Sequence, residues 1–172
     1  MLSLSDNEFS VLSFLVRNFT EKLTIRNIAQ RLNFSPAGVF NILKKLEKNN
    51  IVTGQKFGTG LFYAINFENR IAEHLAAIVL LYSDEKISFD IERLKQAKAA
   101  LLDGKNLLVI VDNITTLDFS IPNINVIAKT EDEMIDSLRK KDQAALQMLK
   151  NGIVLFGEEK IVEIIKNCIS RF

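Results

Sequence analysis

The sequence contains a single cysteine, Cys168, which excludes a disulfide bond within the chain and suits a reducing interior. It also contains a single histidine, His74, so a zinc site built from several histidine and cysteine ligands is excluded. The longest apolar run, residues 75–82, is far shorter than the roughly 20 residues that cross a bilayer, and the N-terminus shows no signal-peptide pattern. These absences predict a globular cytoplasmic protein without a membrane segment.

Glycine is scarce as well, and none of the seven glycines belongs to a glycine-rich phosphate loop. Three of them, Gly54, Gly58 and Gly60, fall in one short stretch, where they predict a hairpin. Acidic residues cluster at 131–133 and 158–159, where the dipole of a following helix explains them without a metal ion. We therefore expect no catalytic residues, no metal site and no cofactor.

The net charge is only +1, but the charged residues are unevenly distributed. Residues 1–67 carry eight basic and four acidic side chains, whereas residues 68–172 carry fourteen basic and seventeen acidic ones. A basic first part and an acidic second part are typical of a nucleic-acid-binding module joined to a segment that does not contact phosphate.

The stretch from residue 20 to residue 67 predicts helix, turn, helix and hairpin in close succession. Thr24 and Ser35 are suitable helix caps, and Pro36 suits a first helical position because its missing N–H is not needed there. The expected elements are helices over 25–32 and 36–48, followed by strands over 51–57 and 61–66. This order is that of a winged helix-turn-helix, a module that reads DNA.

The run from Ser35 to Val52 resembles the recognition helix and wing entry of MarR-like and archaeal winged-helix regulators. It shares with them a small residue at the helix start, the helix end Leu46-Glu47-Lys48 and a following apolar strand, and residues 61–66 resemble their wing exit. Asn50 stands where the family usually has glycine, and asparagine is the next best residue for a left-handed position. The resemblance covers about residues 5–67 and implies a winged helix.

The same resemblance implies that helix 36–48 enters the major groove of DNA. Asn41 would then contact adenine, and Ala37 would meet a thymine methyl group. Lys44 or Lys45 would bind guanine or phosphate, and cations of the preceding helix and of the wing would bind phosphate. The residues expected at the DNA are Arg26, Arg31, Ser35, Ala37, Asn41, Lys44, Lys45, Lys48 and Lys56.

Residues 68–102 are expected to form two linking helices, one over 68–82 and a more charged one over about 90–102. The first has more than one apolar stripe, which is more surface than a small first domain can cover. We therefore expect a homodimer, although the second domain could instead cover this surface within one chain. The expected interface residues are Ile71, Leu75, Ile78, Val79 and Tyr82.

After residue 103 the pattern alternates between strands and helices. Strands are expected over 107–111, 124–128 and 152–157, with helices beginning after Thr130, at Asp142 and over 158–169. Residues 125–134 and 148–159 resemble the back half of small nucleotidyltransferase domains, which need a Gly-Ser loop and an Asp-x-Asp pair for activity. This chain has no Gly-Ser pair and reads Asp103-Gly104-Lys105-Asn106 at the corresponding place, and Asp112 and Asp118 lie on an expected loop. We therefore expect this domain to be non-catalytic.

The sequence thus predicts an α+β protein with a winged-helix DNA-binding domain over 1–67, linking and dimerisation helices over 68–102, and a degenerate nucleotidyltransferase-like α/β domain over 103–172. The expected function is sequence-specific transcriptional regulation of a prokaryotic, archaeal type, with the last domain used for sensing, dimerisation or scaffolding. Expected partners are double-stranded DNA, a second copy and an unidentified small effector. Two alternatives stay open: a winged helix that binds protein, and an active nucleotidyltransferase.

Overall fold

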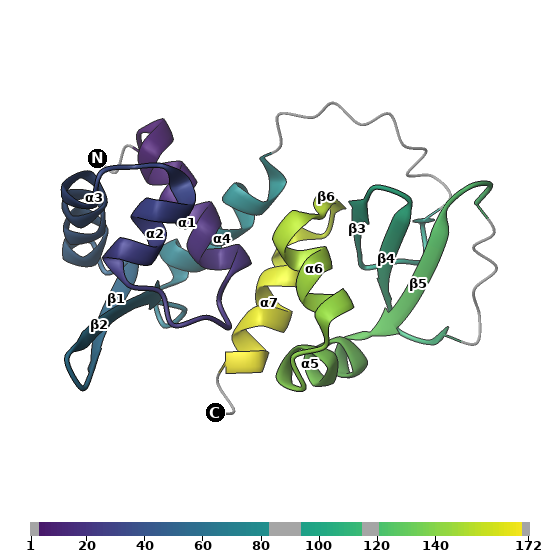
Figure 1. The fold of residues 1–172 in the computed structure, drawn as a ribbon. Helices are drawn as coiled ribbons and strands as arrows, with labels where there is room; N and C mark the ends of the chain where they lie inside the picture. The colour runs from purple at the N-terminus through teal and green to yellow at the C-terminus, as the bar shows by residue number, and fades with distance from the viewer. Residues whose placement is uncertain (1–3, 83–93, 115–120, 170–172) are drawn as a thin grey trace. The chain divides into compact units, whose positions relative to one another are not determined.

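A computed structural model describes residues 4–82, 94–114 and 121–169 of the protein. By its internal contacts the chain divides into two compact units, Met1–Val79 and Leu80–Phe172 (Figure 1). The elements up to the boundary are α1 (Asp6–Arg17), α2 (Ile25–Leu32), α3 (Pro36–Lys48), β1 (Val52–Phe57), β2 (Gly60–Ile65) and α4 (Arg70–Leu81), whose last residues cross into the second unit. The three-part division at residues 67 and 102 stays a prediction.

The first three helices begin at capping residues, of which Thr24 and Ser35 were predicted from the sequence. At α1, Ser5 and Glu8 form a capping box in which each side chain bonds to the backbone N–H of the other residue. Thr24 and Asn27 form the same arrangement at α2, and the Ser35 hydroxyl caps α3. These caps satisfy N–H groups that have no partner inside a helix, which fixes where each helix starts.

The wing is the antiparallel hairpin of β1 and β2, in which Val52 lies opposite Ile65. Gly58 in its turn has a φ of 58°, a left-handed conformation that glycine adopts at little cost. Asn50, between α3 and β1, has a φ of 57°, so this asparagine does occupy the left-handed position expected of it. The predicted order of helix, turn, helix and wing is confirmed.

Packing and one ion pair hold α3 against the rest of the first unit. The buried face of α3 consists of Val39, Leu43 and Leu46. Beside this face, Lys45 Nζ lies 2.7 Å from Glu8 Oε1 of α1. Glu8 is only 4% exposed, and its other oxygen accepts hydrogen bonds from the backbone N–H and the hydroxyl of Ser5 at 2.8 and 3.1 Å. One carboxylate therefore joins the start of α1 to α3.

The surroundings of Glu8 act on its pKa in opposite directions. Burial by itself raises the pKa of Glu8, because the carboxylate loses hydration. The hydrogen bonds from Lys45 and Ser5, together with the Lys45 charge, outweigh burial and hold the pKa below the ordinary value of 4.5. The pair therefore stabilises the folded state wherever Glu8 is ionised.

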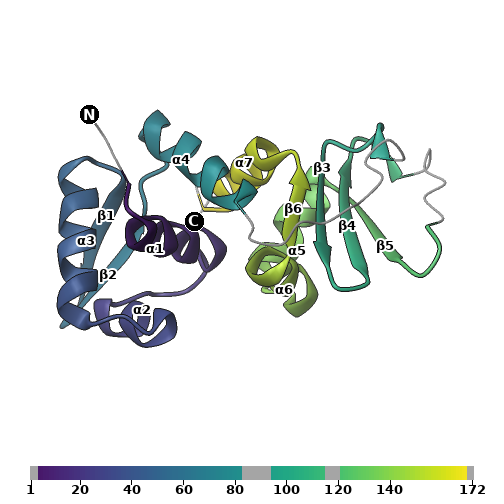
Figure 2. The same cartoon turned by 90° about the horizontal axis from the view of Figure 1, so that it is seen from above.

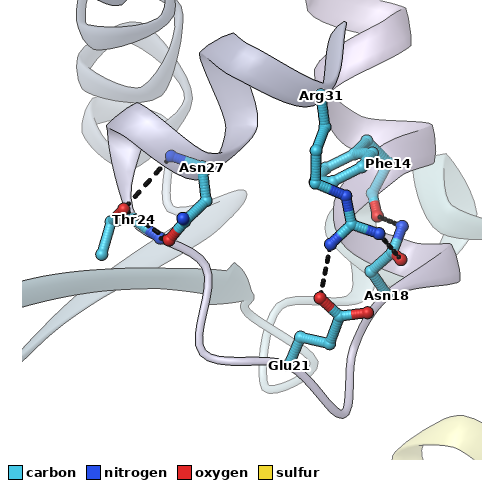
Figure 3. Close-up of polar contacts among 6 residues, drawn as sticks. All are labelled: Phe14, Asn18, Glu21, Thr24, Asn27 and Arg31. Atoms are coloured by element: carbon cyan, nitrogen blue, oxygen red, sulfur yellow. Dashed lines mark hydrogen bonds and ion pairs between the residues drawn. The ribbon is translucent and has the colours of Figure 1, made fainter.

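The Arg31 side chain of α2 makes several contacts with α1 and the loop that follows it (Figure 3). Its guanidinium lies 2.5 Å from Glu21 Oε2 and donates to Asn18 Oδ1 at 2.9 Å. It also lies 4.8 Å from the centroid of the Phe14 ring, a cation–π distance. The Asn18 amide in turn donates to the Phe14 carbonyl at 2.8 Å, so this group of contacts ties α2 to the C-terminal end of α1.

The described part of the second unit contains a four-stranded sheet in the order β5-β4-β3-β6. Its elements are β3 (Ala99–Asp103), β4 (Asn106–Val111), β5 (Asn125–Thr130), α5 (Glu131–Arg139), α6 (Gln143–Asn151), β6 (Ile153–Phe156) and α7 (Glu158–Ile169). β3 is antiparallel to β4 and β6, whereas β4 is parallel to β5. Helices α5, α6 and α7 lie on the same side of this sheet (Figures 1 and 2). No helix in the described ranges is long and apolar enough to cross a membrane.

The sheet of the second unit is closely packed on its other face as well. A buried cluster there consists of Leu94, Ala100, Leu107, Val109 and Val111. Between β6 and α7, Gly157 has a φ of 75° and passes so close to the chain before β3 that a Cβ atom would lie 2.2 Å from the Lys98 carbonyl oxygen. A residue with a side chain cannot occupy that position without moving the backbone.

The helix predicted over 90–102 is wrong in its last part. Residues 83–93 lie outside the described residues, but Ala99–Asp103 is strand β3, paired on both edges. Alanine and leucine favour a helix, yet two neighbouring strands and nearly complete burial determine the conformation here. Asp103 pairs with Asn106 across a tight turn in which Gly104 has a φ of 59°. The strands and helices predicted after this turn are confirmed, with ends shifted by one or two residues.

Replacing Glu8 by glutamine should lower the free energy of unfolding by about 1–2 kcal/mol near neutral pH, because the amide loses the charge that pairs with Lys45. The pKa of Glu8 is lowered in the fold, so this loss should be fully present above the unfolded-state value of 4.5. It should shrink as the pH falls from 4.5 through the folded-state pKa. Urea unfolding of both proteins, followed by circular dichroism over a series of pH values, measures the difference.

Glu47→Gln is the matched control, because Glu47 pairs with exposed Lys44 within α3 and its loss should change stability little. If Glu8→Gln lowers stability equally at neutral and at acidic pH, the charge of Glu8 does not have the role described above.

Candidate nucleic-acid interface

One side of α3 is exposed along the whole length of the helix. Residues three or four apart share a helix face, and the exposed residues with this spacing that do not pair with α1 are Ala37, Phe40, Asn41, Lys44 and Lys48; Lys45, also exposed, pairs with Glu8. These five residues form what is here named the reading face. The opposite side carries the buried core residues of α3, so the helix presents two cations, one amide, one aromatic ring and one small residue outward.

The polar members of the reading face differ in how they are held. Asn41 and Lys48 make no hydrogen bond or ion pair with any part of the chain that the structure describes, which leaves them available to a ligand. Lys44 Nζ lies 2.7 Å from Glu47 Oε2, and this hydrogen bond raises the pKa of Lys44. Lys44 is therefore firmly charged at neutral pH.

The other residues predicted at the DNA fall into two groups. Arg26 on α2 and Lys56 on β1 are exposed and unpaired within the described ranges. Lys45 and Arg31, by contrast, form the ion pairs to α1 and to the loop after it, and the Ser35 hydroxyl caps α3. The first group can meet phosphate directly, whereas the second would have to leave its present partners. DNA contacts by all five residues stay predictions.

The wing is attached to the segment that precedes α2. Tyr63 of β2 donates its backbone N–H to the Leu23 carbonyl at 2.9 Å, and Thr24 forms a β-bridge with Phe62. The N-terminal cap of α2 is therefore part of the same hydrogen-bonded ribbon as the wing. Backbone hydrogen bonds therefore hold the wing at a fixed angle to α2.

β1 passes close to the C-terminal half of α3 at Gly54. A Cβ atom here would lie 2.9 Å from Glu47 Oε1 and 3.2 Å from Cε1 of the Tyr63 ring. Tyr63 is 2% exposed, and its hydroxyl has no hydrogen-bond partner among the described residues. Burial raises the pKa of Tyr63, so the hydroxyl stays protonated beside the Lys44–Glu47 pair. A side chain at position 54 would therefore displace the Glu47 carboxylate and press against the buried Tyr63 ring.

Two aromatic side chains of the winged helix are exposed, and neither was predicted to take part in binding. Phe40 on α3 is 43% exposed, and Phe57 near the end of β1 is 54% exposed, with Lys22 Nζ 5.0 Å from its ring centroid. Helical spacing alone could have placed Phe40 beside Ala37 on the reading face. The exposure of Phe57 could not be predicted, because it depends on how the end of the hairpin twists.

The residues predicted at a dimer interface lie on or just after α4. Ile71, Ile78 and Tyr82 are 57%, 52% and 62% exposed. Leu75 is half-buried and Val79 is fully buried, so Val79 does not belong to an outer surface. Leu81, which was not predicted, is 46% exposed.

No group of three or more histidine, cysteine, aspartate or glutamate side chains in the described residues could hold a metal ion. His74 is exposed on α4, and Cys168 is buried, which raises the pKa of its thiol. Asp112 is exposed and lies 2.5 Å from Lys98 Nζ, and Asp118 lies outside the described residues.

Among solved structures, the chain is similar to CymR (YrzC), the global cysteine regulator of B. subtilis, with 14% sequence identity and a TM-score of 0.35. That similarity covers 55% of this chain and 80% of CymR. No curated protein gives a match. Residues 2–58, which include α1, α2, α3 and β1, match the model of the MarR family. The first unit therefore contains a MarR-type winged helix-turn-helix.

Proposed function

We propose that the protein is a sequence-specific DNA-binding transcriptional regulator that acts in the cytoplasm and places α3 in the major groove. A MarR-type winged helix-turn-helix by itself suggests a DNA-binding regulator. The observation that supports the more specific proposal best is the reading face, which is exposed along α3 and has two polar side chains, Asn41 and Lys48, that are unpaired within the described residues.

The chemistry of the reading face suits the edges of base pairs. The Asn41 amide can donate to N7 or accept from N6 of adenine, and both together make a bidentate contact. Ala37 is small enough to let the helix approach a thymine methyl group closely. The ammonium groups of Lys44 and Lys48 suit guanine O6 and N7 or a neighbouring phosphate.

The exposed cations away from α3 suit the sugar-phosphate backbone. Arg26 on α2 and Lys56 on the wing belong to the elements on either side of α3 in the sequence, as phosphate contacts of a winged helix require. We infer that Lys45 and Arg31 act mainly by holding α3 and α2 in place, since both have protein partners at hydrogen-bond distance.

The purified protein should bind duplex DNA with an affinity that falls steeply between about 50 and 200 mM salt, because phosphate-bound counterions are released on binding. Lys48→Ala and Lys56→Ala should each lower the slope of log K against log salt by about 0.9 if each lysine binds one phosphate. Asn41→Ala should lower discrimination at one base pair by about 1–3 kcal/mol. Fluorescence anisotropy with a duplex selected from random sequences measures all three quantities.

Lys105→Ala is the matched control, because it removes an exposed lysine from the turn between β3 and β4 and should leave the slope unchanged. Absence of binding to any selected or genomic duplex at low ionic strength would refute the proposed function.

We further propose that the protein is a homodimer and that α4 contributes to the interface. One winged helix presents one recognition helix, and specific operators usually combine two half-sites about one DNA turn apart. Exposed Ile71, Ile78 and Tyr82 would bury apolar area in such a contact, which favours association.

Sedimentation equilibrium should give twice the chain mass of 19.5 kDa at micromolar concentration. Ile78→Glu should dissociate the dimer and weaken DNA binding together, because a buried unpaired carboxylate is costly. Ile114→Glu makes the same change at a 40% exposed site on the second unit and should leave the mass unchanged. A 19.5 kDa species for the unaltered protein would rule out the dimer.

We also propose that the second unit does not transfer nucleotides and serves for sensing, dimerisation or as a scaffold. Its Asp103-Gly104-Lys105-Asn106 segment is a tight hairpin turn with glycine and asparagine where the nucleotidyltransferase pattern needs acids. Incubation with labelled ATP or GTP and Mg²⁺ should therefore label neither the protein nor an added acceptor. Transfer that disappears on Asp112→Asn would show that an active site exists there.

A further inference from the structure

Phe40 stands out on the reading face because it is large, apolar and open to solvent. Of the phenylalanines in the described ranges, only Phe40 and Phe57 are exposed, and both lie on elements of the winged helix. The core of α3 is complete without Phe40, because Val39, Leu43 and Leu46 form its buried face. Packing within the chain therefore leaves 43% of this aromatic residue exposed.

The neighbours of Phe40 limit what its ring can bind. A groove that receives an apolar helix face requires apolar residues at several consecutive turns. Here Phe40 is the one large apolar residue of the reading face; its neighbours there are Ala37 and Lys44, and the rest of the face is the polar pair Asn41 and Lys48. A mostly polar and cationic surface with a single apolar group matches the major groove of DNA, whose outstanding apolar group is the C5 methyl of thymine.

We propose that the Phe40 ring contacts a thymine C5 methyl group in the major groove, so that the preferred half-site carries a thymine next to the adenine that Asn41 reads. The inference rests on the proposed function and adds a residue that determines specificity. Asn41 follows Phe40 directly in the helix, so the two side chains leave α3 at nearly the same level along the axis and about 100° apart around it. They would then meet the same or adjacent base pairs.

The size of the effect follows from the methyl group that the ring would shield from water. Burying one methyl or methylene group is worth about 0.8 kcal/mol, which corresponds to about a fourfold change in affinity. Thymine and uracil differ only in this methyl group and share the same hydrogen-bonding pattern. Replacing thymine by uracil therefore isolates the contact with Phe40 from the contacts of Asn41.

The test begins with a duplex selected by the unaltered protein, in which each thymine of a half-site is replaced in turn by deoxyuridine. One replacement should weaken binding by about fourfold. Phe40→Ala should bind the thymine duplex more weakly and should lose nearly all of the difference between thymine and uracil at that position. Phe57→Ala, which removes the other exposed ring, should keep the difference, and the circular dichroism of both variants should match that of the unaltered protein.

Two results would overturn the inference while leaving the proposed function intact: selected DNA that binds equally well with uracil at every position, or a Phe40→Ala variant that retains the full difference. If Ala37→Gly abolishes the difference and Phe40→Ala does not, Ala37 is the residue that reads the methyl group. A protein that selects no duplex at all contradicts the proposed function itself. If Phe40→Ala leaves DNA binding unchanged but abolishes capture of a protein, the ring belongs to a protein interface and the inference is wrong.

Discussion

The position of α3 depends on a carboxylate that the first unit keeps almost wholly out of water. A buried charge without a partner is very costly, so Glu8 holds Lys45 and the start of α1 at fixed places. The buried residues of α3 lie on one side of this ion pair and the exposed residues on the other. The ion pair and the buried residues together determine the rotation of α3 about its own axis. This rotation decides that the five residues of the reading face point outward.

Similar ion pairs engage other cations of residues 1–67 that could otherwise bind a ligand. Of the four acidic side chains of residues 1–67, three, Glu8, Glu21 and Glu47, are paired with Lys45, Arg31 and Lys44. These pairs leave the basic excess of residues 1–67 unchanged, but they engage three of its eight cations. Phosphate contacts would therefore be made mainly by cations outside the pairs, such as Arg26, Lys48 and Lys56.

Local features of the fold could be predicted from the sequence, whereas contacts between distant segments could not. Thr24 and Ser35 act on N–H groups within the next few residues, so their roles follow from spacing alone. The pairing of Lys45 with Glu8 depends on how two helices cross, and no local pattern encodes it. For the same reason β3 was mistaken for a helix: its alanines and leucines favour a helix, and only the pairing with β4 and β6 makes the segment a strand. The reading face, Phe40 included, follows from helical spacing and could be predicted from the sequence.

The close approach at Gly54 brings the wing next to the partner of a cation on the reading face. The β1 backbone lies against the Glu47 carboxylate without a side chain between them, and that carboxylate holds the Lys44 ammonium. A residue larger than glycine at position 54 would have to turn the Glu47 carboxylate aside. Variation at this one position of the wing would therefore reach the ion pair that holds Lys44 on the reading face.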